Sequence, residues 1–126
     1  MVRRESRCRM ILFMIDTTGR ARIGRLVNAE MAKRGMTGAR LAAGGSPGIA
    51  TINRIKAGDP KVTDFMLRAL GDRLGLPRDF LIYVGTGDIR KIEASARPGH
   101  EDDPDLIRWT VEMIRESHND RREQRN

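Results

Sequence analysis

Cysteine and long apolar runs are scarce in this sequence, and each scarcity argues against a class of protein. The 126 residues include one cysteine, Cys8, which cannot form an intrachain disulfide or build a cysteine-based metal site. Residues 10–15 form an apolar run far shorter than the ~20 residues that cross a bilayer, and too short for a secretory signal core. We therefore expect a cytoplasmic protein.

Side-chain pairs that support catalysis are also missing. The two histidines, His100 and His118, have no serine or cysteine at a recognisable spacing, and the glycine pair at 44–45 lacks the lysine of a phosphate loop. The adjacent aspartates at 102–103 are better explained as the acidic start of a helix. We expect neither enzymatic activity nor a metal or cofactor.

Aromatic residues are few, and alternating polar and apolar runs are almost absent. The apolar residues recur instead at helical spacing, which predicts an all-α fold.

Positive charge is plentiful and unevenly distributed. The chain carries 24 basic and 17 acidic residues, a net charge of +7. Residues 1–62 hold 13 basic and 4 acidic side chains, whereas residues 63–126 hold 11 and 13. Such a local excess is typical of nucleic-acid binders, although a basic surface without a motif is often merely solvated.

Residues 36–58, MTGARLAAGGSPGIATINRIKAG, contain the clearest pattern in the chain. Apolar residues recur at one-face spacing, with Leu41 and Ala42 before the GGSPG segment and Ile52 and Ile55 after it. This pattern predicts two short helices joined by a turn.

The second of these helices is predicted at residues 47–57. Ser46 is suited to cap it, Pro47 to its first turn, and Gly58 to the left-handed conformation that follows a helix. If Ile52 and Ile55 point inward, the remaining surface carries small residues, an amide and two cations. Such a helix suits a DNA groove.

This part of the chain resembles the lambda-repressor-like helix-turn-helix family (Cro and repressor, xenobiotic-response-element type). The resemblance covers about residues 23–76 and rests on RGMT at 34–37, the Leu41-Ala42 pair, TINRI at 51–55 and Gly58. The turn departs from the family, which usually has Gly, a small apolar residue and Ser there. The resemblance implies a five-helix DNA-binding domain, most often that of a small prokaryotic repressor, such as a temperate phage immunity repressor.

The family geometry implies that the second helix enters the major groove of double-stranded DNA. The candidate base-reading residues are Gly48, Ile49, Ala50, Asn53 and Arg54. An Asn amide matches adenine N6 and N7, whereas Ile49 and Ala50 are suited to thymine methyl groups. Ile49 is equally compatible with the core, and Asn53 with a solvated surface.

The candidate phosphate contacts are cations and helix-start residues flanking the groove-reading helix. They are Thr37, Arg40, Ser46, Lys56, Lys61, Arg20 and Arg22. Each cation is alternatively a solvated surface residue.

The domain is expected at residues 17–95. Its helices are predicted at 19–34 with a cap at Thr17 or Thr18, 39–43 with a cap at Thr37, 47–57, 63–74 with a cap at Thr63, and 78–84, followed by a short helical segment at 86–95. The first helix is expected to bury an apolar stripe that includes Ile23, Leu26 and Val27, with Arg22 outside, and the helix at 63–74 to bury Phe65 and Leu70. Residues 1–16 form a basic N-terminal arm that is ordered, tracks a phosphate backbone, or precedes a true start at Met10 or Met14.

A C-terminal helix is predicted at residues 104–118, after a linker at 96–103 and before a polar, frayed tail at 119–126. Its packing residues are Leu106, Trp109, Thr110, Met113 and Ile114. These side chains must be buried somewhere, either on their own domain or on a second subunit of a homodimer.

The sequence therefore favours a DNA-binding repressor that occludes a promoter. Two alternatives remain open: an antitoxin that represses its own operon and orders its C-terminal region on a toxin, and a protein-binding adaptor without DNA affinity.

Overall fold

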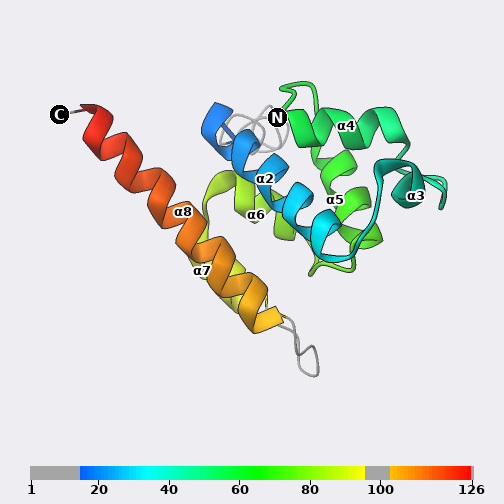
Figure 1. Cartoon of the computed structure of the whole chain (residues 1–126). Coiled ribbons are helices and arrows are strands. Elements are labelled where there is room, and N and C mark those ends of the chain that lie inside the picture. Colours follow the sequence, from blue (N-terminus) through cyan, green and yellow to red (C-terminus); the bar gives the residue numbers. More distant parts are fainter. Residues whose placement is uncertain (1–14, 96–102, 126) are drawn as a thin grey trace, which may run out of the picture.

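Seven α-helices make up the part of the chain described by this computed structural model, residues 15–95 and 103–125 (Figure 1). In chain order they are α2 (Thr17–Lys33), α3 (Gly38–Ala42), α4 (Ile49–Ala57), α5 (Asp64–Arg73), α6 (Phe80–Thr86), α7 (Ile89–Ala94) and α8 (Asp103–Arg125). No strand occurs within those ranges, so the predicted all-α class is confirmed. Most of the predicted arm and linker lie outside the described residues.

Helix α2 is the central element. It packs against α4, α6 and α8, while α5 lies on α4 and α6, α3 on α4, and α7 on both α6 and α8. The core consists of aliphatic and methionine side chains together with Phe80, and its most deeply buried side chains include Leu26, Leu41, Ile52, Ile55, Leu70, Leu74, Leu81, Ile92 and Ile114. Figure 1 shows α3 and α4 at one side of the molecule and α7 and α8 at the other.

Helix α2 buries most of its predicted stripe, with one correction. Ile23, Leu26 and Val27 are buried as predicted, but Arg22, predicted to stay outside, is buried with them. Its Nε donates a hydrogen bond to the Val84 carbonyl at 3.0 Å, and its NH2 donates to the Gly85 carbonyl at 3.1 Å. Because Arg22 precedes Leu26 by one helical turn, it faces the core, where it satisfies carbonyls near the end of α6.

Two predicted helix caps are confirmed and two helix starts are corrected. Thr37 and Thr63 accept hydrogen bonds from backbone N–H groups in the first turns of α3 and α5. For α2, however, the cap is Asp16, whose Oδ1 accepts a hydrogen bond from the Gly19 N–H at 2.8 Å. Neither Thr17 nor Thr18 caps this helix, contrary to the prediction. Helix α6 begins at Phe80 instead of residue 78, because Asp79 is left-handed (φ 62°).

The buried face of α5 differs from the prediction. Phe65, assigned to the core, is 72% exposed, whereas Leu67 and Leu70 are buried. The side chains that share the inner face lie at the spacing 67, 70, 71 and 74, which places position 65 on the opposite side.

The C-terminal helix is longer than predicted and folds back on its own domain. Thr110, Met113 and Ile114 are buried against α7 and α2, so for these three residues the structure favours the first of the two alternatives, packing on their own domain, over contact with a second subunit. Leu106 is partly buried, and Trp109 stays 37% exposed. The predicted frayed tail is helical to Arg125, consistent with the good helix propensity of its Arg, Glu and Gln residues.

Candidate nucleic-acid interface

Helix α4 divides cleanly into a buried side and an exposed side. Ile52 and Ile55 are fully buried in the core, as predicted from their spacing. The residues on the opposite arc are all exposed, and we call them the outer face of α4: Ile49, Ala50, Asn53, Arg54 and Ala57. Four of them were predicted as base-reading residues. Ala57 was missed, although its position one turn after Asn53 and Arg54 indicates the same face.

The exposure of Ile49 excludes one of the two interpretations left open by the sequence. Its side chain is 48% exposed, so Ile49 does not belong to the core. It lies instead beside the first turn of α3, where the position of a Cβ on Gly38 is 3.7 Å from Ile49 Cγ1 and 4.0 Å from Asn53 Oδ1. Ile49 and Asn53 are therefore neighbours along the border between α3 and α4.

The far end of α4 is fixed by close backbone contact with α2. A Cβ on Gly24 would collide with the Lys56 carbonyl, so only glycine permits this approach. Beyond the helix, Gly58 is left-handed (φ 73°), and Arg20 NH1 donates to the Asp59 carbonyl at 3.3 Å. Gly24 was not predicted as important, although a glycine within a buried helical stripe indicates close approach.

The connection between α3 and α4 is held by an arginine from α5. Arg73 NH2 donates to the Leu41 carbonyl at 2.9 Å, and its guanidinium lies against Gly44, where any side chain would displace it. The contact satisfies a carbonyl in the last turn of α3. Nothing in the spacing of the sequence indicated this role for Arg73.

The start of α4 corrects the predicted cap. The helix begins at Ile49 with Gly48 as its N-cap, because Gly48 has an extended backbone (φ −75°, ψ 167°). Pro47 is buried in the connection, joined to Ser46 by a cis peptide bond, and Ser46 is exposed without capping α4. Since Gly48 has no side-chain acceptor, the first N–H groups of α4 receive no side-chain cap.

The predicted phosphate contacts differ in how accessible they are. Thr37, Arg40, Ser46 and Lys61 are exposed, whereas Lys56 and Arg20 are partly buried. Arg22 faces the core, so its assignment as a phosphate contact is wrong. Thr37 Oγ1 is the cap acceptor of α3, as predicted.

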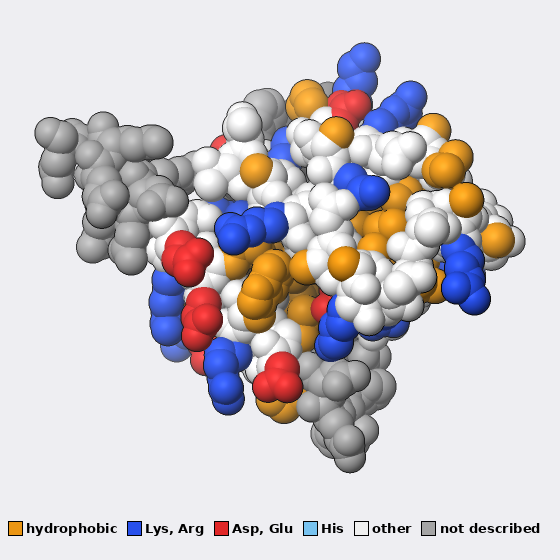
Figure 2. Space-filling view, viewed as in Figure 1, with side chains coloured by type: hydrophobic (Ala, Val, Ile, Leu, Met, Phe, Trp, Pro, Cys, Tyr) orange, Lys and Arg blue, Asp and Glu red, His pale blue; other side chains and the backbone are white. Residues whose placement is uncertain are grey.

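The electrostatic character of this region is one-sided. Residues 31–58, which contain α3 and α4, hold five basic side chains and no acidic one. Figure 2 shows basic and apolar side chains over the α3 and α4 side of the molecule, while several acidic side chains lie among basic ones on the α8 side. The local field therefore favours an anionic partner at α4.

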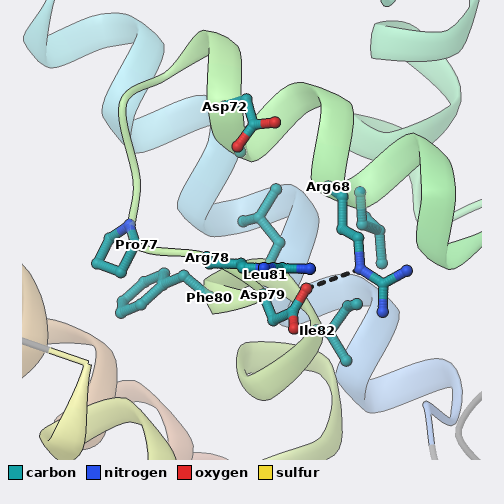
Figure 3. A pocket seen from close by; sticks show the side chains of 10 residues that line it. Arg68, Asp72, Pro77, Arg78, Asp79, Phe80, Leu81 and Ile82 are labelled. Atoms are coloured by element: carbon teal, nitrogen blue, oxygen red, sulfur yellow. Dashed lines mark hydrogen bonds and ion pairs between the residues drawn. The ribbon is translucent and has the colours of Figure 1, made fainter.

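A groove between α5 and α6 offers a different kind of surface (Figure 3). Its main polar feature is Arg68, whose Nε is 2.7 Å from Asp79 Oδ1 and whose NH1 is 3.3 Å from Asp64 Oδ2. The pair with Asp64 lies within α5, whereas the pair with Asp79 joins α5 to the residue that precedes α6, so we assign it to fixing the start of α6 against α5.

The structure and the comparisons add three findings. Within residues 15–95 and 103–125, no cluster of His, Cys, Asp or Glu has the geometry to hold a metal ion. None of the helices described combines the length and apolar character needed to cross a membrane. Comparison of the chain with family models, curated proteins and solved structures finds no match.

Proposed function

We propose that this chain is a sequence-specific regulator that binds double-stranded DNA by placing α4 in the major groove. The observation that carries the proposal is the outer face of α4, which is exposed, free of acidic residues and backed by a fully buried opposite side. An α-helix fits the width of the major groove, and side chains on its exposed face reach base edges there.

The arrangement of helices supports a lambda-repressor-like domain. In this interpretation α3 and α4 form the helix-turn-helix, α2, α5 and α6 complete the five-helix domain, and α7 and α8 are an extension. The connection from Ala43 to Gly48 is longer than the three or four residues usual for the motif. The Arg73 contact with the Leu41 carbonyl compensates by fixing this connection to α5.

The exposed residues divide into two roles. Asn53 and Arg54 supply the polar contacts with base edges, the amide being matched to adenine and the guanidinium to guanine or a phosphate. Arg40 and Lys61 are exposed near the ends of the helix-turn-helix and supply phosphate contacts, with the N–H groups at the start of α4 as further donors. Occupying an operator in this way would block a promoter, so repression is the proposed effect.

Selection of duplexes from a random DNA pool by the purified chain tests the proposal. We expect a consensus site for the wild type, and loss of an adenine preference at one position for Asn53→Ala. An inverted repeat with half-site centres about 34 Å apart would indicate a dimer, whereas a single unrepeated site would indicate a monomer.

Arg90→Ala is the matched control, because Arg90 is an exposed cation on α7, away from α4. This variant should recover the wild-type consensus. Recovery of no consensus by the wild type would overturn the proposal.

A further inference from the structure

The outer face of α4 is largely apolar, which restricts the DNA it can read. Ile49, Ala50 and Ala57 carry no polar side-chain atom, so Asn53 and Arg54 are its only side-chain hydrogen-bonding groups. Isoleucine is among the residues most often buried, yet Ile49 is 48% exposed. An exposed isoleucine at the first residue of α4, on the face proposed to meet DNA, is suited to an apolar partner.

The contacts of Ile49 fix where its methyl groups lie. The side chain rests beside Gly38 at the first turn of α3, and its β-branch restricts χ1 in a helix. Asn53 lies one turn further along the same border, with its Oδ1 near Gly38 as well. The structure thus presents an apolar side chain and an amide side by side.

The major groove contains one apolar group, the C5-methyl of thymine, whereas the other base edges present donors and acceptors. An isoleucine placed against guanine or cytosine would remove water from those polar atoms without replacing their hydrogen bonds. Beside a thymine methyl it buries apolar surface on both partners. Asn53, as its neighbour, is matched to the adenine edge.

Resting on the proposed function, we infer that α4 recognises adjacent A·T base pairs, with Ile49 contacting a thymine C5-methyl group and Asn53 an adenine. Ile49 is then a specificity-determining residue, and the DNA ligand is defined partly by a methyl group.

Replacing thymine by deoxyuridine tests this inference, because the change removes the methyl group and preserves Watson–Crick pairing. In the selected duplex, each thymine is replaced in turn and the Kd is measured for wild type and Ile49→Ala. We expect replacement at one or two positions to weaken wild-type binding roughly fourfold per methyl group. Ile49→Ala should bind the thymine and deoxyuridine duplexes equally at those positions.

Phe65→Ala is the matched control, since it also truncates an exposed apolar side chain but lies on α5. This variant should keep the wild-type response to deoxyuridine. Because Ile49 is half exposed, Ile49→Ala should fold, and thermal unfolding checks this.

The outcomes distinguish a failure of thymine-methyl recognition from a failure of DNA binding itself. Tight binding with the same Kd for every deoxyuridine duplex would overturn methyl recognition and leave DNA binding intact. A deoxyuridine effect that persists in Ile49→Ala would assign the effect to another residue, such as Ala50, or to DNA deformability, and would also overturn the inference. Failure to select any duplex would overturn both the inference and the proposed function.

Discussion

At the scale of single residues, Gly24 controls how closely α2 and α4 approach. An added methyl group would collide with the Lys56 carbonyl, so Gly24→Ala must push the two helices apart. We expect a loss of about 1–3 kcal/mol in the free energy of unfolding, as for other overpacked sites. Urea unfolding measures this loss, and the displaced α4 should also bind the selected duplex more weakly.

Gly71→Ala provides the opposite expectation at a matched position. Gly71 is also a buried helical glycine. Apart from its chain neighbours and the nearby backbone of α5, no heavy atom lies within 4 Å of the position that a Cβ would take. Alanine there should stabilise the domain by roughly 0.5–1 kcal/mol through its higher helix propensity. If both variants were more stable than the wild type, the close approach of α2 and α4 at Gly24 would be contradicted.

Individual polar contacts were harder to predict than individual apolar ones. The burial of Ile52 and Ile55 follows from their spacing alone, because the apolar face of a helix packs against the core. Arg22 was assigned to the surface because arginine usually lies there, yet its guanidinium is satisfied by two carbonyls distant in sequence. A partner 62 residues away leaves no local signal.

At the scale of whole elements, α8 belongs to the core of the domain. Ile114 is fully buried, so Ile114→Ala should lower the free energy of unfolding by about 2–5 kcal/mol. Trp109 is 37% exposed, so Trp109→Ala should lower the free energy of unfolding by less than Ile114→Ala does. Thermal unfolding at two protein concentrations measures both losses. A large, concentration-dependent loss for Trp109→Ala would instead place this side chain in a contact between copies.

The existence of the helices was more predictable than their starts. The helical periods and the threonine caps of α3 and α5 identified those elements, because capping is a local interaction. The start of α4 was misplaced because Ser46, Pro47 and Gly48 form an acceptable cap and first turn in isolation. The structure uses them to complete the connection from α3, which depends on contacts with α5.

At the scale of the whole molecule, the uneven charge distribution predicts that the proposed DNA binding depends steeply on salt concentration. Each phosphate contact contributes a slope of about 0.9 in log K against log salt concentration. Arg40→Ala should therefore reduce the slope by about that amount. Arg90→Ala removes the same charge from α7 and should leave the slope unchanged.

Fluorescence anisotropy titrations at several salt concentrations measure both slopes. Equal slopes for Arg40→Ala and the wild type would remove Arg40 from the phosphate contacts.

The division of α4 into a buried side and an outer face also has a consequence for evolution and design. Substitutions at Ile49, Ala50, Asn53, Arg54 and Ala57 leave the core untouched, because each of these side chains is exposed. A library randomised at these five codons should consist mostly of folded members, whereas one randomised at Ile52 and Ile55 should not. On the proposed function, the sequence read by α4 can therefore diversify without repeated loss of stability.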